Sequence, residues 1–123
     1  MARQHEFDVI VVGGGLVGAS LALALADSGK AVALLEGQNA QFDQLEQGWD
    51  ARIYAVSPAN AEFLERIGVW NHLDPTRIEP IRAMEVRGDQ GARLDFSSFA
   101  AGVPELGWIL ESSLMACELW ENV

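Results

Sequence analysis

Residues 9–18 read VIVVGGGLVG, and this stretch decides the fold. The run at 7–12 is short, apolar and β-branched, which is typical of a strand buried on both faces of a parallel sheet. After the glycines, residues 16–28 have a helix-compatible composition, and Gly29 should end that helix in the left-handed conformation. A second apolar run at 31–36 completes strand, helix and strand. The sequence therefore predicts an α/β fold built on a βαβ unit with a right-handed crossover.

The glycines satisfy the pattern G-x-G-x-x-G, which is weak by itself because glycine-rich runs are common in loops. Here the pattern follows an expected strand and opens an expected helix, so we interpret it as a phosphate-binding turn. Gly13 would permit the tight turn, Gly15 would let the backbone approach a pyrophosphate, and Gly18 would let the helix pack against the strand. The free backbone amides and the helix dipole at the start of this helix would favour the binding of a phosphate group. The candidate phosphate-binding residues are Gly13, Gly14, Gly15, Leu16, Val17 and Gly18.

Glu36 ends the second expected strand, about 20 residues beyond the glycines, where dinucleotide-binding proteins place an acid. Its carboxylate can accept hydrogen bonds from both hydroxyls of an adenosine ribose, and it would repel a 2′-phosphate. The alternative is a glycine turn with an incidental surface acid. The pattern does not separate FAD from NAD.

Composition excludes several classes of protein. The 123 residues hold 18 acidic and 8 basic side chains, a formal net charge of −10, so we expect no nucleic-acid partner and no electrostatic docking to an anionic membrane. The single cysteine cannot form an internal disulfide, which favours a reducing compartment. Histidines and cysteines are too few and too scattered for a zinc site, so no metal is expected.

One stretch has the length of a membrane span. Residues 9–26 carry no charge, but the three glycines interrupt the stretch, and Asp8 and Asp27 close its ends. The acids just before the apolar run also argue against a signal peptide. We therefore favour strand, turn and helix over a membrane span.

Residues 37–49 are polar and rich in glutamine, which predicts a loop. Ser57 and Pro58 should open a helix that ends at Gly68, because serine caps free amides and proline suits the first helical position. The expected apolar face of that helix comprises Ala59, Phe63, Leu64 and Ile67.

A hairpin is expected over residues 81–96, with its turn at 88–91, followed by a loop over 97–107. The alternating apolar positions of the hairpin are Met84, Val86, Leu94 and Phe96. Ser112 or Ser113 should cap a last helix. Its expected apolar stripe is Met115, Leu119 and Val123.

The remaining polar and aromatic residues suggest no catalytic group. His72 lacks a partner at catalytic spacing, and Cys117 reads as a small buried hydrophobe. The four tryptophans are scattered, which predicts no stacking platform. The acids near the C-terminus are expected to form a solvated face, comprising Glu105, Glu111, Glu118 and Glu121.

The chain resembles a known family at three places beyond the turn. Residues 13–36, almost at the N-terminus, look like the ADP-binding fingerprint of large FAD oxidoreductases. Residues 50–58 (DARIYAVSP), 64–70 (LERIGVW) and 106–111 (LGWILE) resemble the ubiquinone-biosynthesis branch of the FAD-dependent aromatic-ring hydroxylases, which share the p-hydroxybenzoate hydroxylase fold. The resemblance spans nearly the entire chain but only the N-terminal part of that family's sequences.

The resemblance implies a Rossmann-like FAD-binding βαβ unit with an added β-hairpin, an incomplete part of a larger flavin hydroxylase fold. It divides the chain into an ADP-binding part at about 7–75, a hairpin and loop at 76–110, and the start of a helix at 111–123. The final helix is still running where the sequence stops, so we expect an N-terminal fragment. Such a piece alone should be poorly loaded with FAD, inactive and prone to self-association.

The resemblance also implies a function: FAD-dependent hydroxylation of the aromatic ring of a polyprenylated ubiquinone precursor, with NAD(P)H as reductant and O2. Arg52 would reach the FAD pyrophosphate or the region beside the flavin, unless it is an ordinary surface arginine paired with an acid. Relatives often carry Asn and Arg where this chain has Ser112 and Ser113. The implied location is cytoplasmic, with peripheral association with the inner membrane or a biosynthetic complex as a further expectation.

Two alternatives remain at this point. One is another FAD oxidoreductase, of amine oxidase or dehydrogenase type, that shares only the first fingerprint. The other is a non-catalytic nucleotide-binding fragment.

Overall fold

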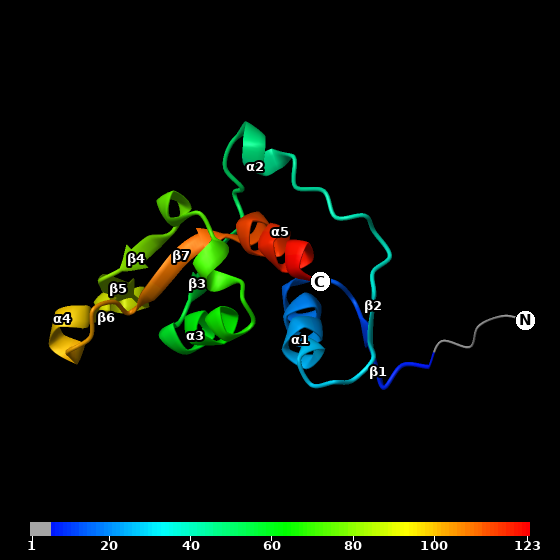
Figure 1. Cartoon of the computed structure of the whole chain (residues 1–123). Helices are drawn as coiled ribbons and strands as arrows, with labels where there is room; N and C mark the ends of the chain where they lie inside the picture. The colour runs from blue at the N-terminus through cyan, green and yellow to red at the C-terminus, as the bar shows by residue number, and fades with distance from the viewer. Residues whose placement is uncertain (1–5) are drawn as a thin grey trace, which may run out of the picture.

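The computed structural model describes residues 6–123 and contains the expected βαβ unit (Figure 1). Strand β1 (Val9–Val12) and strand β2 (Val32–Leu35) are parallel, with Val9 opposite Val32, and helix α1 (Leu16–Ala26) connects them. Gly29 has φ +74°, so the chain leaves α1 through a left-handed glycine as predicted. The α/β class is confirmed.

Burial of the first strand differs from the prediction. Only Val11 of β1 is buried, whereas Ile10 is 57% and Val12 81% exposed. The reason is that Ile10 and Val12 alternate with Val11 and so lie on the other face of the β1–β2 sheet. The apolar run is composed for a sheet covered on both faces, and the described residues leave one side of it bare.

A second, antiparallel sheet was missed by the sequence analysis. Its order is β3 (Ile53–Val56), β7 (Gly107–Glu111) and β4 (Glu79–Ile81). In the structure, β4 and most of β7 lie within the stretch at 76–110, in addition to the expected hairpin and loop. These strands are three to five residues long and pair with partners far away in sequence, so no local alternation announces them.

Helix α3 (Pro58–Arg66) forms as expected. The Ser57 hydroxyl accepts a hydrogen bond from the Asn60 amide at 3.3 Å, and Gly68 ends the segment with φ +77°. Its buried face differs from the prediction in one respect, because Ala61 is buried while Ala59 is exposed.

The predicted hairpin is confirmed as β5 (Ala83–Arg87) and β6 (Arg93–Ser97), in which Met84 lies opposite Phe96 and Val86 opposite Leu94. Residue 81 belongs to β4 instead. The predicted loop at 97–107 contains a short helix, α4 (Ser98–Ala101). Another short helix, α2 (Gln44–Gln47), interrupts the predicted loop at 37–49.

Helix α5 (Ser112–Asn122) packs against α1 and lies between the β1–β2 sheet and the β3–β7–β4 sheet (Figure 1). Its N-cap residue is Glu111, whose own side chain makes no cap bond, so the prediction that Ser112 or Ser113 is the cap is wrong. Met115 and Leu119 are buried as expected, but Val123 is 53% exposed at the end of the helix. The core joins α1, β3, α3, β7 and α5 through Ala19, Val56, Ala61, Leu64, Val69, Leu73, Leu110, Met115 and Leu119.

Across residues 6–123, no helix has the length and apolar character needed to cross a membrane. The uncharged stretch at 9–26 is a strand, a turn and an 11-residue helix.

Candidate functional site

Two glycines of the turn are required by the geometry of the chain itself. Gly13 has φ +102°, and its amide donates to the Leu35 carbonyl at 2.8 Å, which ties the turn to the end of β2. A Cβ on Gly18 would lie 1.8 Å from the Gly13 carbonyl oxygen. Any side chain at Gly18 would therefore push α1 away from the turn. This close approach agrees with the prediction that Gly18 lets the helix pack closely.

Gly15 is different, because a Cβ there would meet nothing within 4 Å. It is the N-cap residue of α1 and offers no side-chain hydrogen bond, and the first bond of the helix runs from the Ala19 amide to its carbonyl at 2.9 Å. In the part of the chain that the structure describes, nothing caps the amides of Leu16, Val17 and Gly18. Open space beside free amides at a helix N-terminus fits a phosphate group.

Glu36 lies against the turn, as the position after β2 predicts. Its Oε2 accepts a hydrogen bond from the Gly14 amide at 2.7 Å, and its Oε1 accepts one from the Gln38 amide at 3.0 Å. These bonds, the one from Gly14 foremost, lower the pKa of the Glu36 carboxyl below its ordinary value. The side chain remains exposed, so an ionised carboxylate is presented beside the glycines with acceptor sites to spare for ribose hydroxyls.

Trp120 supports the turn from α5, a contact that the sequence analysis missed. Its indole Nε1 donates to the Gly14 carbonyl at 2.9 Å, and a Cβ on Gly14 would lie 2.4 Å from the indole ring. Gly14 is thus a glycine because tryptophan packs on it. Since the two residues are 106 positions apart, no local pattern could reveal the contact.

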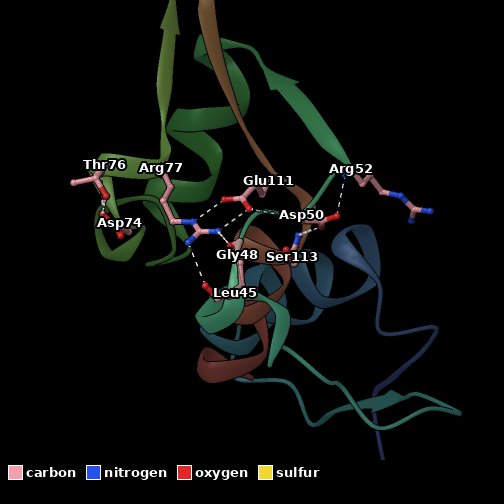
Figure 2. A network of polar contacts seen from close by, with 9 residues as sticks. All are labelled: Leu45, Gly48, Asp50, Arg52, Asp74, Thr76, Arg77, Glu111 and Ser113. Carbon is pink, nitrogen blue, oxygen red and sulfur yellow. Dashed lines mark hydrogen bonds and ion pairs between the residues drawn. The ribbon is translucent and has the colours of Figure 1, made fainter.

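Arg52 and the glycine turn line one groove. The groove has a volume of about 590 Å³ and is also lined by Tyr54, Ser112 and Ala116. An adjoining hollow of about 710 Å³ shares Arg52, Ser112 and Ala116 with it. The guanidinium of Arg52 points away from its neighbours (Figure 2), and no acid among residues 6–123 forms an ion pair with it. The groove therefore joins Arg52, the residue before β3, to most of the glycine turn. Gly14 and Glu36 do not line it, although they are hydrogen-bonded to each other at the turn.

Arg77 and Glu111 form an ion pair in the network of polar contacts that includes Asp50 (Figure 2). Nε of Arg77 donates to Oε2 of Glu111 at 2.7 Å, and Nη2 donates to Oε1 at 2.7 Å. Glu111 is 2% exposed, so its expected place on a solvated acidic face is wrong. Hydrogen bonds from Arg77 lower the pKa of Glu111, and those same bonds raise the pKa of Arg77. An acid inside an acidic stretch looks solvated until its partner, 34 residues away, is known.

Asp50 connects this ion pair to Arg52. Its amide donates to Oε1 of Glu111 at 2.6 Å, and its carboxylate accepts from the amides of Arg52 at 2.9 Å and Ser113 at 3.1 Å. The pKa of Asp50 is lowered, first by the Arg52 amide. Ser113 thus contributes its backbone to the network rather than a helix cap.

The ion pair predicts a loss of stability in acid. A carboxyl whose pKa is lower in the folded chain stabilises it above the unfolded value, 4.5 for Glu111, and that contribution is lost as pH falls through the folded pKa. We expect Glu111→Gln to remove part of the decline in unfolding free energy between about pH 5 and pH 3, measured by urea denaturation. Glu85→Gln, at an exposed hairpin pair, is the control and should leave the decline in place. Identical pH profiles for wild type and Glu111→Gln would contradict the assignment.

The other residues considered from sequence form no site. Cys117 is half-buried rather than fully buried, with Sγ 3.8 Å from a Glu121 oxygen, and His72 contacts Glu118 at 3.3 Å on the surface. Trp70 and Trp108 pack edge to face at 5.2 Å, as core aromatics do. No group of three potential metal ligands occurs among the described residues.

A βαβ unit, a glycine turn with free helix amides and an acid after the second strand that bonds the turn together define the Rossmann type of dinucleotide-binding fold. The chain belongs to the FAD binding domain family, whose model matches residues 6–104. The cofactor prediction of FAD is thereby confirmed, and the question of FAD or NAD that the turn alone left open is answered. The roles of single residues remain predictions.

Curated relatives include enzymes of ubiquinone biosynthesis. The chain is 32% identical over 114 residues to the 3-demethoxyubiquinol 3-hydroxylase of Escherichia coli, covering 93% of this chain and 29% of that protein. It is 33% identical over 108 residues to the ubiquinone hydroxylase UbiL of Rhodospirillum rubrum, covering 88% of this chain and 25% of that protein. The chain thus spans less than a third of the length of these relatives.

Solved structures show the same fold. The structure of P. aeruginosa PqsL aligns with 96% of this chain and 30% of its own, with a TM-score of 0.70 and 22% identity. The p-nitrophenol 4-monooxygenase PnpA from Pseudomonas putida DLL-E4 aligns with 93% of this chain and 28% of its own, with a TM-score of 0.64 and 24% identity. The expected fold of the flavin hydroxylases is confirmed for the aligned part.

Proposed function

We propose that this chain provides the ADP-binding part of an FAD-dependent monooxygenase that hydroxylates the aromatic ring of a polyprenylated ubiquinone precursor. The observation that carries the FAD-binding part is the groove shared by the glycine turn and Arg52. The proposed reaction is supported by the names of two relatives, the 3-demethoxyubiquinol 3-hydroxylase of Escherichia coli and the ubiquinone hydroxylase UbiL of Rhodospirillum rubrum. This reading is favoured over an FAD enzyme sharing only the first fingerprint, because similarity covers most of the chain.

In this proposal different residues bind different parts of FAD. The amides of Gly15, Leu16 and Val17 would hold the pyrophosphate at the N-terminus of α1. Glu36 would accept the ribose hydroxyls, and Arg52 would contact the pyrophosphate or the adjoining part of FAD. The guanidinium of Arg52 has no ion-pair partner among the described residues, and the groove has room for the pyrophosphate and the adjoining part of FAD.

Bound FAD would supply oxygen activation, after reduction by NAD(P)H. The chain's own part is to bind and orient the cofactor. No residue of the groove is assigned to proton transfer or to the aromatic ring. The inner membrane or a biosynthetic complex is the proposed site of action, since a polyprenylated substrate is strongly apolar.

The test is an assay of the full-length protein with NAD(P)H, O2 and a polyprenylphenol. We expect the protein to purify with FAD and to form a hydroxylated phenol that contains one oxygen atom from 18O-labelled O2. Omission of the phenol is the control and should leave that product absent. FAD-loaded protein that oxidises NAD(P)H without forming this product from any polyprenylphenol would contradict the proposed substrate class.

A further inference from the structure

The segment between β2 and β3 extends away from the β1–β2 sheet and from the β3–β7–β4 sheet (Figure 1). Its only helix, α2, has four residues, and within residues 6–123 the segment pairs with no strand. Such a segment is costly to order, because little apolar surface is buried to offset the loss of backbone entropy. Yet it ends at Arg52, two residues after Asp50, and Arg52 lines the groove.

The side chain of Arg77 binds the backbone of this segment. Nη1 donates to the Leu45 carbonyl at 3.2 Å and Nη2 to the Gly48 carbonyl at 2.7 Å, and the guanidinium lies 4.4 Å from the centre of the Trp49 ring. The same guanidinium bonds Glu111 in a bidentate manner. All three nitrogens of the guanidinium are therefore in use, and a lysine could not replace this planar fork.

Glu111 extends the contact toward the groove. It accepts the amide of Asp50, and the Asp50 carboxylate accepts the amides of Arg52 and Ser113. The Arg52 carbonyl in turn accepts the Ser112 amide at 2.8 Å. A continuous series of hydrogen bonds thus runs from Arg77 to the backbone of Arg52 (Figure 2).

The two charged residues are shielded from water, with side-chain exposures of 17% for Arg77 and 3% for Glu111. Because the pair is shielded from water, salt screens it only weakly, and the bidentate contact fixes its geometry. Neither side chain lines the groove, so neither is placed to touch a cofactor there. Their effect on binding must pass through the residues that they hold.

We propose that Arg77 and Glu111 are positioning residues, which fix the 45–52 segment so that Arg52 is presented to the diphosphate of FAD. The inference rests on the proposed function, in which Arg52 contacts the cofactor. Holding Arg52 in place before FAD arrives lowers the ordering cost of binding, because a preorganised group loses less freedom when it is engaged. The ion pair therefore acts on affinity without touching the ligand.

A double-mutant cycle on the full-length apoprotein tests this proposal, with FAD as the probe and its dissociation constant measured by flavin fluorescence. Arg52→Ala should weaken FAD binding at least about tenfold, the loss expected for a charged hydrogen bond. Arg77→Lys should weaken it several-fold in the wild-type background and cause no further loss in the Arg52→Ala background. Arg87→Lys, at an exposed hairpin pair, is the matched control and should bind FAD like wild type.

Equal loss from Arg77→Lys in both backgrounds would overturn the proposal, because the effect would then be general rather than through Arg52. An unchanged affinity in Arg77→Lys, or in Arg52→Ala alone, would overturn it as well. Wild-type protein that binds no FAD would instead contradict the proposed function. If circular dichroism shows that Arg77→Lys is unfolded, the cycle is run with Glu111→Gln, for which the same non-additivity is expected.

Discussion

Gly15→Val should abolish FAD binding while the βαβ unit remains folded. The backbone of Gly15 is in the extended region, with φ −69° and ψ −173°, which valine adopts without strain. Apart from its chain neighbours, a Cβ there meets no atom of the chain within 4 Å, so the added side chain projects into open space beside the amides of α1. That space is where the pyrophosphate is predicted to lie.

The measurement is the FAD content and the far-ultraviolet circular dichroism of the purified full-length variant. We expect apoprotein with an unchanged helix signal. Gly18→Ala is the matched comparison, because its Cβ would lie 1.8 Å from the Gly13 carbonyl oxygen and must displace α1 or the turn. That variant should lose both FAD and thermal stability. Near-normal FAD content in Gly15→Val would show that the phosphate does not bind at this turn.

Glu36→Ala should weaken binding of ADP and FAD by about tenfold or more, because charged hydrogen bonds to two ribose hydroxyls are lost. The variant also loses the acceptors of the Gly14 and Gln38 amides, so part of the effect is a less ordered turn. Glu36→Gln separates the two causes, since it keeps one acceptor for Gly14 but has no charge. We expect an intermediate affinity for this variant.

Calorimetry with ADP and 2′-phospho-ADP measures the effect. Wild type should prefer ADP, because the carboxylate, whose pKa is lowered by the Gly14 amide, repels a 2′-phosphate. Glu36→Ala should lose most of this preference. Equal affinities for ADP in wild type and Glu36→Ala would disprove the ribose assignment.

Much of the candidate site was accessible from sequence, because its residues are local. Gly13, Gly15, Gly18 and Glu36 lie within one βαβ unit, so strand, turn and helix periodicity place them together without knowledge of the rest of the chain. Arg52 was assigned through a family resemblance rather than through spacing. The structure adds that it lines the same groove as the turn.

The sequence did not predict the residues and strands that support the site from distant parts of the chain. Trp120 and Arg77 reach their partners across 106 and 34 positions, and the strands β3, β4 and β7 exist only as a paired set. Short strands carry little local signal, and an acid such as Glu111 reads as solvated until its arginine is in place.

The sequence by itself determined the βαβ unit, the capped helix α3, the hairpin and the glycine turn, since each depends on contacts between near neighbours and on backbone conformations that particular residues favour. Only the tertiary structure decided which acid is buried, which tryptophan packs on Gly14, and where Arg52 lies relative to the turn. The physical reason is that burial and pairing are properties of segments brought together by folding, and many distant pairings are compatible with the same local pattern.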